Sequence, residues 1–140
     1  MADFGEKTRI RAIEAEEWLH RDHVGRMLGR LGLRPSPWLE FKYAVIGRII
    51  SAACHVIGHF QGMYFAGRLE SGNVNEYLHL AKLIEGTVLA DELACVLEMA
   101  RVEKEHEVYF LSRIAVHPWL PWFSRVFAWG PGKSFNDVPG

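Results

Sequence analysis

The apolar residues of this chain recur every three or four positions, which is the period of helices that pack through one face. No run of alternating apolar and polar residues is long enough to predict a strand. The spacing predicts four long helices and a short apolar helix in the tail, the long ones at about residues 8–31, 38–57, 58–84 and 89–116. The pattern therefore indicates an all-α fold.

Glycine and proline divide these predicted helices. Gly32 and Gly86 are natural ends for the first and third helices, and Pro118 ends the fourth. Gly58 predicts a break before the third helix, and residues 71–73 (Ser-Gly-Asn) mark a point where that helix could bend or split.

Composition limits the class of protein. The 140 residues suit one domain, which we divide into a helical domain at 1–118 and an apolar, aromatic tail at 119–140. The formal net charge of -1 gives no basic surface for nucleic acid. Two cysteines make no disulfide framework, and the polar N-terminus lacks the apolar core of a signal peptide. Polar residues interrupt the most apolar stretch, 43–66, so we expect a cytoplasmic protein that could lie peripherally on the inner face of a membrane.

Ionisable residues interrupt the predicted apolar face of three helices. In the first helix the predicted core stripe reads Ile10, Ile13, Glu17, His20, Val24, Met27 and Leu31, so Glu17 and His20 occupy successive core positions between apolar neighbours. In the third helix Glu70 is the only charge in the stripe Val56, Phe60, Met63, Gly67, Glu70, Val74, Tyr77, Ala81 and Ile84. In the fourth helix the stripe is Val96, Met99, Glu103, His106 and Phe110. Burying an isolated carboxylate is costly, so each must be paired, protonated or bound to a metal.

The spacing of these residues suits metal binding. Glu and His three positions apart project from the same helical face and can hold one ion together. Imidazole with carboxylate suits iron, manganese or zinc, and di-iron bundles combine two Glu-x-x-His helices with single Glu residues from two others. The sequence predicts five metal ligands, Glu17, His20, Glu70, Glu103 and His106. We expect two irons per site, with one ion or another divalent metal as the alternative.

The alternative interpretation is that these residues bind no metal. A single Glu-x-x-His arises by chance in Glu-rich helices, and a stripe drawn one position wrong would place these residues at the surface. We interpret the neighbouring carboxylates as solvated or as supports for the ligands: Glu14, Glu16, Glu98, Glu105 and Glu107. We interpret the other histidines as polar-face or packing residues: His23, His55, His59, His79 and His117.

Three further features carry candidate chemistry. Tyr77 follows Glu70 by seven residues on one stripe, so it is either a substrate-side residue near the metals or a core tyrosine. The tail tryptophans Trp119, Trp122 and Trp129 fit a membrane interface, a lid over the bundle or a subunit contact. Residues 130–134 end like a phosphate loop but lack the first glycine and a preceding strand, so we reject that interpretation.

In their order along the chain, these residues resemble the di-iron demethoxyubiquinone hydroxylases of ubiquinone biosynthesis, within the ferritin-like superfamily. The resemblance covers residues 14–113 and rests on Glu17 and His20, the Leu-Arg-Pro-Ser at 33–36, a glycine-bearing apolar helix, Glu70 with Tyr77, and Glu103 with His106. It implies a ferritin-like bundle, with an apolar helix at 38–57 lying at the membrane. It also implies a hydroxylase that activates oxygen at two irons and acts on a membrane-borne quinone near Tyr77.

The family has a sixth ligand, a Glu on an additional core helix upstream of the first Glu-x-x-His. Here the residues before Glu17 continue the same helix. Three explanations are open: a second subunit supplies the ligand, the site holds less metal, or the chain begins further upstream. Three core helices bury too little apolar surface alone, so we predict a homodimer that completes the bundle.

Three functional classes are consistent with these residues. The first is a di-iron hydroxylase with a separate electron donor, since no dinucleotide fingerprint is present. The second is a non-enzymatic bundle that binds metal or quinone at a degenerate site. The third is a structural helical protein whose buried polar residues fix the geometry of a partner.

Overall fold

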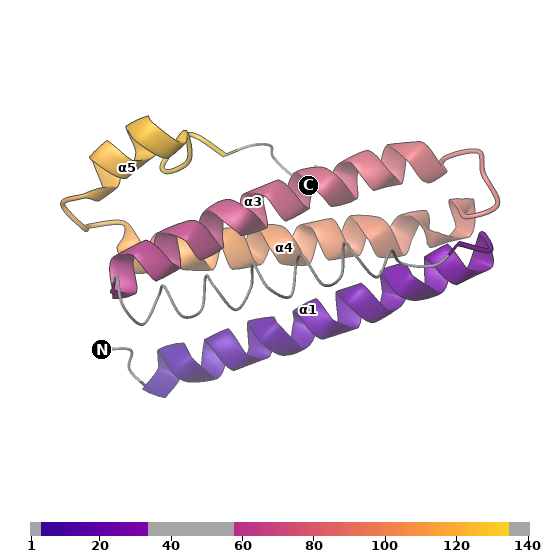
Figure 1. Ribbon diagram of the computed structural model, residues 1–140, viewed down its shortest axis with the longest axis horizontal. Coiled ribbons are helices and arrows are strands. Elements are labelled where there is room, and N and C mark those ends of the chain that lie inside the picture. The colour runs from indigo at the N-terminus through magenta and orange to yellow at the C-terminus, as the bar shows by residue number, and fades with distance from the viewer. Residues whose placement is uncertain (1–3, 34–57, 135–140) are drawn as a thin grey trace. The chain divides into compact units, whose positions relative to one another are not determined.

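A computed structural model describes residues 4–33 and 58–134 of the chain, and Figure 1 shows its helices. The elements are α1 (Phe4–Arg30), α3 (His59–Ile84), the 3-10 turn η1 (Ala90–Glu92), α4 (Leu93–Ile114) and α5 (Leu120–Phe127). No strand occurs in the described residues, so the all-α prediction is confirmed. The predicted helix at 38–57 lies outside the described part of the chain.

The chain divides into two compact units, Met1–His59 and Phe60–Gly140, and α1 belongs to the first. Three of its predicted core residues are buried at seven-residue intervals, Ile13, His20 and Met27. Gly32 ends the helix where the sequence predicts, because its φ of 70° is readily adopted only by glycine. Leu31, the last member of the predicted stripe, follows the helix and is exposed.

In the second unit, α3 and α4 pack as an antiparallel pair. Phe60 near the start of α3 stacks on His117 just after α4, with ring centroids 4.1 Å apart. Further along α3, Glu70 lies 3.8 Å from His106, measured between Oε2 and Nδ1. Residue numbers therefore rise along one helix as they fall along the other. The predicted bend at Gly72 does not split α3, which continues to Ile84.

The buried face of this pair matches the predicted stripes. On α4 it includes Val96, Met99, Glu103, His106 and Phe110, and on α3 it includes Phe60, Met63, Gly67, Glu70, Val74, Ala81 and Ile84. The heptad-like spacing therefore identified the contact surface of both helices from sequence alone.

The predicted short apolar helix of the tail is α5, and the chain after it folds back onto α3 (Figure 1). Trp129 is fully enclosed, and its carbonyl oxygen accepts a hydrogen bond of 2.6 Å from the hydroxyl of Tyr64. Arg68 Nε donates to the carbonyl of Phe127 at 2.9 Å. Trp129 is thus a packing residue, whereas Trp122 on α5 is 59% exposed.

None of the helices in the described segments combines the length and the apolar character that crossing a bilayer requires.

Gly67 and Gly72 provide a matched pair of substitutions on α3. A Cβ at Gly67 would overlap the ring of Trp129 and lie 3.0 Å from Cβ of Phe110, whereas a Cβ at Gly72 meets nothing within 4 Å. We expect Gly67→Ala to lower the free energy of unfolding by about 1–3 kcal/mol through overpacking. Gly72→Ala should raise it by about 0.5–1 kcal/mol through helix propensity. Urea denaturation measures both, and equal effects would contradict this packing.

Tyr64 gives a prediction for alkaline pH. Burial raises the pKa of Tyr64 above its usual 10.0, outweighing the opposing effects of the Trp129 backbone and the positive charge of Arg68. Because the folded pKa exceeds the unfolded one, this stability is complete below about pH 10 and is lost as pH rises through the folded pKa. We expect wild-type stability to fall more steeply above pH 10 than that of Tyr64→Phe in denaturant titrations. Parallel curves would contradict the buried, proton-holding hydroxyl.

Candidate metal centre

Three of the predicted ligands belong to the α3–α4 pair, and all three are buried. Glu103 and His106 lie three positions apart on α4, so both side chains leave the helix on the face that meets α3. Both are 0% exposed, and Glu70 on α3 is 6% exposed. Each occupies a position where the helical pattern would otherwise have an apolar residue.

The ligand atoms of these three side chains converge. His106 Nδ1 lies 3.7 Å from Oε2 of Glu103 and 3.8 Å from Oε2 of Glu70. One donor atom from each of the three residues can be chosen so that all lie within 4.8 Å of one another. The amide of Asn73, one turn after Glu70, is 3.5 Å from the same Glu70 oxygen.

The distances between these side chains suit a shared metal ion. Two atoms that each bind one ion at about 2.1 Å can lie at most about 4.2 Å apart, so both separations from His106 Nδ1 are compatible with a shared ion. Two carboxylates and one imidazole are donors that iron, manganese and zinc accept. A cation would also compensate two carboxylates that are withdrawn from water. The residues therefore fit a divalent metal.

The other predicted site residues are Glu17 and His20 on α1 and Tyr77 on α3. Glu17 is half-buried and His20 is buried, both on α1 in the first unit. Tyr77 is half-buried, seven residues after Glu70 on α3. The roles of these three side chains stay predictions.

Two neighbouring carboxylates on α4 are solvated, as the sequence predicts. Glu98 and Glu105 have side chains 58% and 54% exposed, and both pair with Arg101 between them. The hydrogen bond from Arg101 lowers the pKa of Glu98. Screening by water makes such surface pairs minor contributors to stability.

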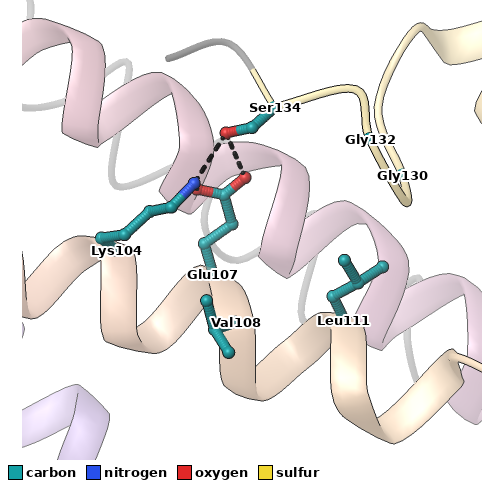
Figure 2. Close-up of a pocket in the computed structure, with 7 residues that line it drawn as sticks. All are labelled: Lys104, Glu107, Val108, Leu111, Gly130, Gly132 and Ser134. Atoms are coloured by element: carbon teal, nitrogen blue, oxygen red, sulfur yellow. Dashed lines mark hydrogen bonds and ion pairs between the residues drawn. The ribbon is translucent and has the colours of Figure 1, made fainter. Parts of the chain in front are cut away.

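Glu107 is the third carboxylate of α4 that the sequence led us to interpret as solvated or as a support for the ligands. It is only 3% exposed, so it is not solvated. Its Oε1 accepts hydrogen bonds of 2.8 Å from Nε1 of Trp129 and from Oγ of Ser134, and its Oε2 lies 3.2 Å from Nζ of Lys104. Figure 2 shows the contact of Ser134 with this carboxylate. The helical pattern could not indicate this burial, because two of the partners, Trp129 and Ser134, lie 22 and 27 residues later in the chain.

A hollow of about 310 Å³ opens beside Glu107, lined by α4 and the turn at 130–134. Its polar side chains bond to one another, because Ser134 Oγ also lies 2.9 Å from Nζ of Lys104 (Figure 2). A phosphate group here would meet the Glu107 carboxylate. The geometry thus agrees with rejecting a phosphate loop at these residues.

The chain was also compared with known proteins. No protein family, no curated protein and no solved structure matches it.

Proposed function

We propose that the chain is a metal-binding helical protein whose centre is built on Glu70, Glu103 and His106, with iron as the metal. The observation that carries this proposal is the convergence of two carboxylates and an imidazole inside the α3–α4 contact. If this contact were purely structural, apolar side chains at these positions would serve it as well or better, because burying ionisable groups seldom adds stability.

The proposal includes Glu17 and His20 of α1 as further ligands. Its support is the sequence, because they repeat the Glu-x-x-His spacing of Glu103 and His106 within an apolar stripe. The burial of His20 is in keeping with that role. Five ligands with this composition suit two irons better than one.

The activity we propose is oxygen-dependent hydroxylation of a quinone-like ring, as the resemblance to the demethoxyubiquinone hydroxylases implies. Bound iron would supply the activation of oxygen. One oxygen atom would enter a ring C–H bond and the other would leave as water, with two electrons and two protons from a separate protein or reduced pyridine nucleotide. The apolar side chains around Glu103 and His106 would exclude bulk water, and Tyr77 would lie on the substrate side.

A second candidate is a non-enzymatic bundle that holds a metal or a quinone. It is favoured by the number of candidate ligands, five in this chain against six in the family scheme. The cytoplasmic location and the contact with a membrane surface are part of the hydroxylase proposal, since a quinone substrate is membrane-borne.

The metal is tested by anaerobic titration with Fe(II), using Glu103→Gln and Glu98→Gln as matched changes on α4. We expect Glu103→Gln to bind iron at least about tenfold more weakly, and the exposed Glu98→Gln to bind as wild type does. Iron at one hundred times its Kd should add about 2.7 kcal/mol to wild-type stability. Absence of iron binding by the wild type would rule out the proposal.

The same iron-loaded preparations separate the two functional classes. With a chemical reductant, oxygen and a short-chain quinone, a hydroxylase gives a product heavier by one oxygen atom in mass spectrometry. Iron binding without oxygen-dependent product would favour the non-enzymatic bundle.

We also propose a homodimer. Trp18 and Leu19, between the predicted ligands Glu17 and His20, are 62% and 68% exposed and offer an apolar contact surface. We expect a dimer by light scattering at micromolar concentration and a monomer for Leu19→Asp. Val116→Asp, at a position 98% exposed between α4 and α5, is the control and should leave the dimer intact. A helical wild-type monomer would contradict the proposal.

A further inference from the structure

We propose that Trp129 positions the two ligand-bearing helices of the metal centre, acting through a contact set that we call the tail clasp. The clasp consists of Trp129 and its contacts with Glu107 on α4 and with Tyr64 and Gly67 on α3. This inference rests on the proposed metal function, because it concerns what holds Glu70 opposite Glu103 and His106.

The contact with α4 is polar and enclosed. The indole N–H of Trp129 donates to Oε1 of Glu107 at 2.8 Å, between a residue that is 0% exposed and one that is 3% exposed. Hydrogen bonds to a charged acceptor are about twice as strong as neutral ones, especially away from water. Glu107 directly follows His106 and lies one turn after Glu103, so fixing its side chain fixes the segment of α4 that carries both candidate ligands.

The contact with α3 is a close approach of the same indole. The ring of Trp129 occupies the space that a side chain at Gly67 would need. Its carbonyl oxygen accepts the hydroxyl hydrogen bond of Tyr64 at 2.6 Å. Gly67 lies three residues before Glu70 on the same buried face, so the ring of Trp129 contacts α3 within one turn of Glu70.

Trp129 therefore contacts both helices. On each helix its contact lies within one turn of the candidate ligands. Sliding or rotating α3 against α4 would break either the indole–carboxylate bond or the ring contact at Gly67. The chain enters Trp129 through Ala128, whose φ of 56° lies in the left-handed region. That conformation costs a non-glycine residue about 1–2 kcal/mol, which the docking of Trp129 must offset.

The test compares Trp129→Phe with Trp122→Phe. The first removes the indole N–H but keeps an aromatic ring, and the second makes the same change at an exposed tryptophan of α5. Co(II) is the probe, since its visible bands report both affinity and ligand geometry. We expect Trp129→Phe to weaken Co(II) binding about tenfold and to alter the bands, at a temperature where both variants are folded. Trp122→Phe should match the wild type.

A second pair of variants covers the case in which Trp129→Phe does not fold. Glu107→Gln keeps an acceptor oxygen for the indole, whereas Glu107→Leu removes it. We expect Glu107→Gln to retain most of the Co(II) affinity and Glu107→Leu to lose it. Equal Co(II) binding and unchanged bands in Trp129→Phe, or in Glu107→Leu, would overturn the proposal.

A measurement without metal separates this inference from the proposed function. In the metal-free protein, the imidazole ¹⁵N signals of His106 report the groups that pack around it. We expect Trp129→Phe to shift these signals and Trp122→Phe to leave them in place. If the wild type binds no Co(II), the metal function fails, and a shift in Trp129→Phe alone still supports the clasp. Unchanged His106 signals in Trp129→Phe would overturn the clasp as well.

Discussion

The packing of α3 against α4 removes ionisable side chains from water, and its stability depends on how their charges are compensated. Glu103 and His106 are completely enclosed, and Glu70 is nearly so. Removing one member of a buried charged pair typically costs about 3–5 kcal/mol, because the remaining charge keeps its desolvation penalty. Such groups are therefore tolerated only together, and their mutual distances restrict how the two helices can be packed.

The same constraint recurs at Glu107 with a different solution. There the carboxylate is compensated by an indole N–H, a hydroxyl and an ammonium group, all provided by the protein. At the centre built on Glu103 and His106, the nearest groups include another carboxylate, which adds negative charge. The two sites are neighbours on one helix, and a different set of groups encloses each of them.

Much of this arrangement could be predicted from the sequence, for reasons that are local. The three- and four-residue spacing on α3 and α4 identified the buried faces, including the polar positions Glu70 and Glu103. Gly32 and Gly86 predicted helix ends because each has a positive φ that favours glycine. Glu107 could not be understood in this way, because its burial depends on Trp129 and Ser134, which lie 22 and 27 residues later in the chain. The role of Gly67 could not be predicted either, because its lack of a side chain matters only where Trp129 of the tail packs against it.

The enclosure of Trp129 also gives the protein an internal optical reporter. Among the described tryptophans, Trp18, Trp119 and Trp122 are more than half exposed, whereas Trp129 is shielded on all sides and hydrogen-bonded to a carboxylate. Its emission should therefore lie at shorter wavelengths than that of the other three described tryptophans and resist dissolved quenchers that reach them. A change in this shielded component of the fluorescence would report a change in the packing of the tail.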